Sequence, residues 1–197
     1  MIRKYINQKI YKIVVRKFRT SSSVYFSYIE FQETLSKSRV LHKLDTFDTN
    51  KEVEKKTFKY KTGSTYTGEW LGGFRHGYGR MSWKDGTFYE GYWHLGCAEG
   101  IGEMQFSNQD IMRGEFKYNK LNGYGECFQA ELGYNYKGNW LNDLQSGMGF
   151  EHWVDGSFYI GQYEMGKKEG FGKYQWADSS FFIGEWKDNK IHGYVIN

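Results

Sequence analysis

A five-residue pattern with a central glycine recurs through this chain at a period of 23 residues. Its first copy is Tyr66-Thr67-Gly68-Glu69-Trp70, in which the glycine separates two large aromatic residues. A fixed period of this length is typical of repeat proteins, in which each unit packs against its neighbours. One interval is 24 residues long, which predicts a one-residue insertion in the third copy, near Glu131–Asn135. The six copies begin at Tyr66, Tyr89, Met112, Tyr136, Tyr159 and Phe182.

A Gly-x-Gly signature follows within each copy, as in Gly77-Tyr78-Gly79. Large residues alternate with small or polar ones on both sides of it, which is the periodicity of β-strands. Between the two strand patterns of the first copy, the glycine-rich stretch Leu71–Tyr78 predicts a turn. After the second strand pattern, Asp85-Gly86 predicts a tight hairpin turn. In the sixth copy the second glycine of the signature is lost, giving Gly193-Tyr194-Val195.

These signals predict a mainly β protein, a single-layer antiparallel β-hairpin solenoid of about six 23-residue repeats. Each copy forms one hairpin, and successive hairpins pair side by side into one long sheet. About twelve strands at ~4.7 Å spacing give an array roughly 50–60 Å long. A partial copy, Phe58–Tyr60 followed by Thr62-Gly63, precedes the first, so we place the array at residues 58–197.

The glycines of the chain all lie between Gly63 and Gly193. A glycine in the middle of a strand often marks the close approach of another group. We therefore expect the central glycine of each copy, such as Gly68, to leave room for aromatic rings from neighbouring strands. The first glycine of the Gly-x-Gly signature, such as Gly77, is present in all six copies, and we expect it to adopt a positive φ angle.

The pattern resembles the MORN repeat (membrane occupation and recognition nexus). The resemblance covers about residues 58–195. The third copy departs most from the family's motif, so its local geometry is open; it has Met112, Phe116, Asn119 and Asn122 at motif positions. The first copy is the closest match, through Tyr66, Gly68, Trp70, Gly73, His76, Gly77, Gly79, Trp83, Asp85 and Gly86.

This resemblance implies a binding function. MORN-only members of the family organise cytoskeletal and ciliary structures, so it implies a non-catalytic scaffold for protein–protein interaction, located in the cytoplasm at the cytoskeleton or cilium. Other members bind membranes, which implies an alternative, a membrane or phosphoinositide tether. A third alternative is a mitochondrial protein that carries an N-terminal transit peptide.

The aromatic residues that flank the central glycines are the candidate array or binding face. Two interpretations remain open at this point, because the rings form either the core of the sheet or a surface for a partner. The set comprises Tyr66, Trp70, Tyr89, Trp93, Tyr136, Trp140, Tyr159, Tyr163, Phe182 and Trp186.

The head of the chain, residues 1–23, predicts a basic amphipathic helix or arm, with apolar residues at helical spacing. One interpretation is an arm that binds an anionic surface, such as membrane headgroups or an acidic partner. The other is a mitochondrial transit peptide, which is also basic and free of acidic residues. The candidate anionic-surface residues are Arg3, Lys4, Lys9, Lys12, Arg16, Lys17 and Arg19.

Residues 24–57 predict a helical extension followed by a charged linker. Within them, residues 28–45 have Tyr28, Phe31, Leu35, Leu41 and Leu44 on one side of a helix. We expect this helix to pack over the first strand of the array.

Chemistry-bearing motifs are scarce. The Gly-x-Gly sequences belong to the repeat and lack the third glycine of a dinucleotide-binding loop. The five histidines have no spacing typical of metal ligands. We therefore expect no catalytic residue, no cofactor and no metal site, and we predict that the protein is not an enzyme.

Charge is distributed unevenly along the chain. Residues 1–29 contain seven basic and no acidic residues, whereas residues 63–197 contain twelve basic and seventeen acidic residues. We expect protein partners for the array, an anionic membrane surface as a partner for the arm, and no nucleic acid. The sixth copy ends at Asn197 after half a hairpin, so self-association through the C-terminal strand edge is a further expectation.

Overall fold

The computed structural model describes residues 53–193. The chain divides into two compact units, Met1–Thr46 and Phe47–Asn197, and all the described residues belong to the second. The predicted basic arm and the predicted helix at residues 28–45 lie outside the described residues. Within residues 53–193 the structure contains no helix with the length and apolarity needed to cross a membrane.

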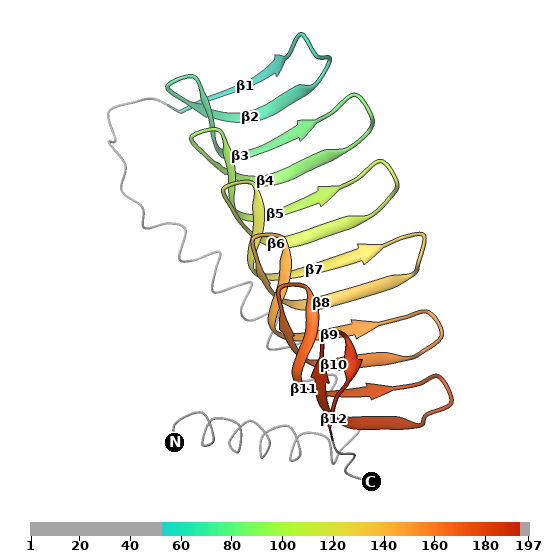
Figure 1. Ribbon diagram of the computed structural model, residues 1–197. Helices are drawn as coiled ribbons and strands as arrows, with labels where there is room; N and C mark the ends of the chain where they lie inside the picture. The colour runs from blue at the N-terminus through green and yellow to red at the C-terminus, as the bar shows by residue number, and fades with distance from the viewer. Residues whose placement is uncertain (1–52, 194–197) are drawn as a thin grey trace, which may run out of the picture. The chain divides into compact units, whose positions relative to one another are not determined.

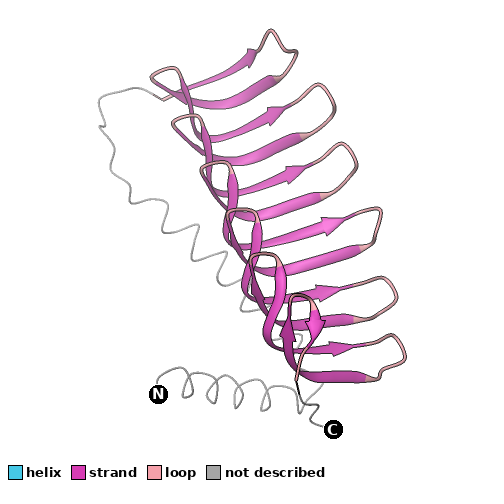
Figure 2. Cartoon of the chain, viewed as in Figure 1, coloured by secondary structure: helices cyan, strands magenta, loops and turns pink. Residues whose placement is uncertain are grey.

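The described residues form one open antiparallel sheet of 13 strands, paired in sequence order from β1 to β13. Figures 1 and 2 show the hairpins side by side along the array, with strands and turns as its only elements. The prediction of a mainly β array of hairpins is confirmed. The strands are β1 (Glu54–Lys59), β2 (Thr65–Leu71), β3 (Phe74–Ser82), β4 (Phe88–His94), β5 (Cys97–Gln105), β6 (Ile111–Lys117), β7 (Lys120–Gln129), β8 (Tyr134–Leu141), β9 (Leu144–His152), β10 (Phe158–Glu164), β11 (Lys167–Gln175), β12 (Phe181–Lys187) and β13 (Lys190–Ile191).

The first strand adds a thirteenth element to the twelve that the repeats predict. Strand β1 begins at Glu54, four residues before the boundary placed at residue 58. It pairs with β2 over its whole length, from Glu54 opposite Trp70 to Lys59 opposite Thr65. The sheet therefore starts inside the segment predicted as a charged linker.

Two-residue turns join the strands within each hairpin, and the prediction of a broad turn over Leu71–Tyr78 is wrong. The turn consists of Gly72-Gly73, and β3 already begins at Phe74. Both turn residues have positive φ angles, 58° and 86°, as a type I′ hairpin turn requires. In the later copies Tyr118-Asn119 and Asn142-Asp143 occupy this turn without any glycine, so composition alone does not reveal it.

The longer turns between hairpins follow the predicted Asp-Gly signal. The Asp85 carboxylate accepts hydrogen bonds from the backbone N–H and the hydroxyl of Thr87, which fixes the turn. The third copy carries its extra residue in this turn: six residues lie between the paired Phe128 and Asn135, against five between the equivalent pair Ser82 and Phe88. The predicted insertion site is therefore confirmed.

A repeated irregularity bends the first five hairpins. Gly68 pairs with Gly79 and Trp70 pairs with Arg75, so two more residues lie on β3 than on β2 between these pairs. Such a bulge increases local twist and bends the strand. Gly77, within the bulge, has a φ angle of 60°. The φ angle of the equivalent glycine is also positive in the other five copies, as expected. The strands accordingly curl near the two-residue turns (Figure 1).

Aromatic rings cover the paired glycines at the centre of each hairpin. In the fourth copy a Cβ on Gly138 would lie 2.6 Å from the Tyr136 hydroxyl oxygen and 2.7 Å from the Cα of Gly149. The ring above Gly138 therefore comes from its own strand, two residues earlier, and not from a neighbouring strand as predicted. The same ring extends over Gly149 on the neighbouring strand.

Hydrogen bonds from the two-residue turn of one hairpin to the second strand of the preceding hairpin link successive copies. The backbone N–H of Asn119 donates to the Ala98 carbonyl at 3.0 Å, and the Asn119 side-chain oxygen accepts from the Ala98 N–H at 2.8 Å. The Asp143 side chain and backbone repeat both bonds with Leu121. This turn ladder satisfies polar groups that the strands themselves leave unpaired.

Candidate functional site

The ten aromatic residues singled out by the repeat form the core of the array. Each of them is buried, from Tyr66 at 0 % exposed to Trp70 and Trp140 at 8 %. We call their side of the sheet the inner face and the opposite side the outer face. Because these rings are covered by their neighbours, the interpretation of this set as a binding surface is replaced by that of a core.

Edge-to-face contacts connect the rings along the inner face. The Tyr66 ring lies 5.0 Å from Trp70 of its own copy and 5.4 Å from Trp93 of the next. Tyr89 makes the same two kinds of contact, with Trp93 and Phe116. Such pairs add about 0.5–1.5 kcal/mol each beyond the area that they bury. Burial raises the pKa of the Tyr66 hydroxyl to about 12, partly opposed by the charge of Arg75.

The third copy keeps the regular geometry although Met112 replaces the tyrosine. Leu121 is fully buried, and its Cδ atoms lie 3.0 and 3.1 Å from a Cβ placed on Gly125. In the second copy Ala98 occupies the position of Leu121. The larger aliphatic side chain therefore fills the space that a tyrosine ring fills elsewhere.

A buried ion pair interrupts the apolar core between the fourth and fifth copies. The Lys168 ammonium group pairs with the Glu151 carboxylate, and their side chains are 14 % and 6 % exposed. The Tyr134 hydroxyl donates a 2.9 Å hydrogen bond to Glu151. The ammonium group also lies 5.3 Å from the Trp153 ring and 5.0 Å from the Tyr159 ring. Because both charged side chains are largely buried against aromatic rings, we assign the pair to packing.

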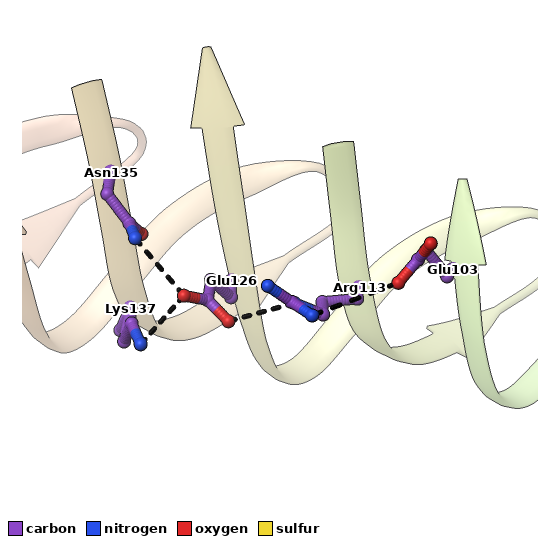
Figure 3. A network of polar contacts seen from close by, with 5 residues as sticks. All are labelled: Glu103, Arg113, Glu126, Asn135 and Lys137. Carbon is purple, nitrogen blue, oxygen red and sulfur yellow. Dashed lines mark hydrogen bonds and ion pairs between the residues drawn. The ribbon is translucent and has the colours of Figure 1, made fainter. Parts of the chain in front are cut away.

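The outer face carries a row of charges along its centre in the first half of the array. Figure 3 shows Glu126 between two cations: Arg113 donates to it at 2.9 Å and Lys137 at 2.7 Å. Asn135 adds a hydrogen bond at 3.2 Å, and Glu103 lies 3.9 Å from Arg113. Burial alone would raise the pKa of Glu126, but the bonds and charges of Lys137, Asn135 and Arg113 outweigh it and hold the pKa below its ordinary value.

The same row becomes mainly apolar in the second half of the array, with Lys173 between Ile160 and Ile183. Lys137 pairs with Phe150, and Phe150 pairs with Ile160 on the next strand. Ile183 continues the row opposite Lys173. We call Phe150, Ile160 and Ile183 the apolar row. Phe158 and Phe181 flank this row, with the Lys173 ammonium group 5.1 and 5.2 Å from their rings.

The sequence does contain a signal for the apolar row, at a position between the aromatic and glycine positions of the repeat. The second residue of each copy is Thr67, Glu90, Arg113 or Lys137 in copies one to four, and isoleucine in copies five and six. Because strands alternate faces, this position lies opposite the core and determines the character of the outer face.

The remaining sequence expectations concern a metal site and the basic arm. Within residues 53–193 no group of three or more histidine, cysteine or acidic side chains is placed to hold a metal ion. The seven basic residues of the arm, from Arg3 to Arg19, lie outside this range.

Comparisons with known proteins identify the repeat. A family model described as MORN repeat matches residues 66–88, 89–111, 113–129, 136–158, 159–181 and 182–194. A search of curated proteins finds no match.

Solved structures similar to the chain include two TCP-type domains. The first is the SAS-4 (dCPAP) TCP domain of Drosophila melanogaster in complex with a proline-rich motif of Ana2 (dSTIL). It has 13 % identity and a TM-score of 0.40, covering 74 % of this chain and 75 % of that one. The second is the wild-type TCP10 domain of Danio rerio CPAP, with 15 % identity and a TM-score of 0.41, covering 77 % and 68 %.

Proposed function

The chain belongs to the MORN-repeat family, and on that premise we propose that it is a non-catalytic scaffold that binds protein partners through the outer face of its array. We further propose that the assembly it serves is cytoskeletal or ciliary, as in MORN-only members of the family. One observation carries the choice of surface: the inner rings are buried in the core, whereas the outer face changes from a charged row to the apolar row within a single sheet.

The composition of the outer face fits a protein better than a phosphate-bearing partner. Protein interfaces combine an apolar centre with a polar rim. The apolar row supplies an apolar centre, and the Glu126 network with its two cations supplies a polar rim. Anionic lipid and nucleic acid instead need an excess of positive charge. Residues 63–197 have seventeen acidic and only twelve basic residues, so the array lacks that excess.

A second candidate function rests on the head of the chain. The seven basic residues and absent acids of residues 1–29 favour attachment to an anionic membrane, with the array as the part held there. A mitochondrial transit peptide is the other use of the same composition. Membrane attachment and a transit peptide are both compatible with a scaffold function, because each determines the location of the protein in the cell and not what the array binds.

Substitutions on the apolar row test the proposed scaffold. The full chain with Ile160→Thr and Ile183→Thr places at both sites the residue that the first copy has at Thr67. Val154→Thr, at an exposed turn between hairpins, is the matched control. Each chain is expressed as a proximity-labelling fusion. We expect the isoleucine variant to lose a defined set of labelled neighbours that the control retains, with unchanged unfolding midpoints. An identical set of neighbours for all three chains would refute the outer face as the binding surface.

Sedimentation with vesicles tests the alternative. The full chain and a variant with Lys9, Lys12, Arg16 and Lys17 all changed to Gln are mixed with phosphatidylserine vesicles at physiological salt. Binding that depends on these residues supports the tether and predicts mislocalisation of the variant in cells. Strong binding that survives the four substitutions would place lipid recognition on the array, against the charge argument.

A further inference from the structure

Several of the two-residue turns display large apolar side chains to solvent. Leu95, Tyr118 and Met165 are the first turn residues of copies two, three and five, and they are 46, 68 and 74 % exposed. In copy four the residues that flank the turn, Leu141 and Leu144, are 55 and 45 % exposed. Successive hairpins place these turns one after another along the array (Figure 2). We call these four turns with their flanking residues (94–97, 117–120, 141–144 and 164–167) the turn edge.

The backbone of these turns disfavours the side chains that they carry. The φ angles of Leu95, Tyr118 and Met165 are 45°, 50° and 50°. Large side chains rarely adopt positive φ, and turns of this type favour glycine or asparagine. Gly72 and Asn142 stand at the same position in copies one and four. The chain therefore accepts backbone strain to expose apolar groups that bury little area, and strain of this kind concentrates at functional sites.

Two lysines face each other across the turn that carries Tyr118. Lys117 pairs with Lys120, and like charges opposite each other on neighbouring strands destabilise a sheet. Neither lysine forms an ion pair with a carboxylate of residues 53–193. The Asp143 carboxylate of the next turn accepts a 2.7 Å hydrogen bond from the Leu121 N–H. The lysine pair thus presents positive charge beside an exposed ring, and acidic groups of a partner would complement it.

The spacing of the turns determines which chain conformation can follow them. Hydrogen bonds to the preceding copy hold each turn in place, as the 2.9 Å bond from the Gly166 N–H to the Gln145 carbonyl does. Equivalent turns of neighbouring copies are two strands apart, which is about 9.5 Å at ~4.7 Å per strand. The polyproline II conformation, a major conformer of unfolded chains, has three residues per turn and rises ~3.1 Å per residue. Every third side chain of such a segment therefore points the same way at intervals of about 9.3 Å, close to one copy.

The charges of the turn edge favour a protein segment over a membrane. Its basic residues are Lys117, Lys120 and Lys167, and its acidic residues are Asp143 and Glu164. The Lys167 ammonium group also donates to Asp188 of the next turn at 2.7 Å. Binding to anionic lipid needs a clear excess of positive charge, which this edge lacks.

We propose that the turn edge binds an extended, acidic segment of a partner protein. In this complex the segment places carboxylates beside Lys117 and Lys120. Apolar side chains at intervals of three residues pack beside Tyr118, the leucines of copy four and Met165. The site goes beyond the proposed scaffold function because it adds a second binding surface, made by turns and separate from the apolar row.

Selection from random peptides tests this site. A phage-displayed library of peptides of about twelve residues is panned against the full chain, and peptides that also bind the variant Lys117→Gln, Lys120→Gln are removed. We expect the remaining peptides to be rich in Asp and Glu, with apolar residues three positions apart. A selection that yields no peptides, or peptides without acidic residues, would overturn the proposal.

The tightest peptide is then labelled and titrated against purified variants of the full chain. Tyr118→Asn with Met165→Asn should weaken binding at least tenfold, and the unfolding midpoint should hold or rise, since asparagine tolerates positive φ. Leu132→Asn, at a 63 % exposed turn residue between hairpins, is the control and should bind as the wild type does. Unchanged binding by the double variant contradicts the proposal. So does a lower midpoint, which would assign the two side chains to folding.

Two further chains separate this site from a membrane surface and from the outer face. Phosphatidylserine vesicles that bind the full chain but not the asparagine double variant would assign the turn edge to lipid and overturn the peptide proposal. The chain with Ile160→Thr and Ile183→Thr should bind the peptide as the wild type does. Loss of peptide binding there would move the peptide to the apolar row, whereas loss of labelled neighbours with intact peptide binding leaves both surfaces standing.

Discussion

The Tyr136 ring lies directly above Gly149 on the neighbouring strand, so that a Cβ at Gly149 would come within 2.5 Å of its Cε2 and hydroxyl oxygen. The hydroxyl donates a 3.0 Å hydrogen bond to the Asn139 carbonyl, which holds the ring in place. The same arrangement recurs with Tyr89 and Tyr159, whose hydroxyls bond the carbonyls of Tyr92 and Gln162.

Gly149→Ala should destabilise the array by about 3 kcal/mol, because the added methyl group forces the ring or the backbone to move. Urea unfolding of the full chain, followed by tryptophan fluorescence, measures the change. Gly86→Asn is the control: a Cβ at Gly86 meets nothing within 4 Å, and asparagine tolerates its φ angle of 92°. A loss below about 1 kcal/mol for Gly149→Ala would show that the ring moves aside freely.

Leu121→Ala should cost about 2–5 kcal/mol, since it empties the space that the ring fills in other copies. Adding Met112→Tyr should recover much of the loss, because the second copy combines Tyr89 with Ala98 at these positions. A double-mutant cycle in urea quantifies the coupling. Additive losses from the two substitutions would mean that the third copy does not follow the packing of the second.

Lys168→Leu should cost about 3–5 kcal/mol, because it leaves the Glu151 carboxylate buried without its cation. The double variant Glu151→Met, Lys168→Leu should regain or exceed wild-type stability, since it reproduces the Met104 and Leu121 of copies two and three. Thermal and urea unfolding of the three chains decide between these outcomes. If the double variant is as unstable as the single one, the ion pair contributes more than its cost of burial.

Glu126→Gln should flatten the acid side of the stability profile. The folded protein lowers the pKa of Glu126 below about 4.5, so its ionised form adds stability that is present above this pH and is lost as the pH falls through the folded value. At pH 7 the variant should be less stable by about 1–2 kcal/mol. Unfolding between pH 3 and 7 is the measurement, with the exposed Glu164→Gln as control. Equal slopes for wild type and Glu126→Gln would contradict the assignment.

The repeat period was sufficient to predict the hairpins, their order and the positive φ of Gly77, because backbone register follows directly from it. The two-residue turns were not predicted, because some of them, such as Tyr118-Asn119, contain no glycine. A turn that is held by hydrogen bonds to the preceding copy does not need the composition of an isolated turn.

The side-chain arrangement was harder to predict than the backbone. Glu151 and Lys168 are separated by two turns and the whole of β10, and each looks like a surface residue in the sequence. Leu121 compensates for Met112 from across the hairpin, which a motif read along one strand does not reveal. The sequence left open whether the aromatic candidates form core or surface, and the structure buries all ten of them.

The order of the strands also determines how the array responds to force. Each strand pairs only with its immediate neighbours, and the described chain enters at one end of the sheet and leaves at the other. Tension applied through the two ends of the described chain therefore acts on one strand pair at a time. The hydrogen bonds of that pair break one after another. Compression instead presses all the hairpins together. An array of this kind is therefore suited to resist compression, as a spacer between two partners does. It is poorly suited to resist tension between them.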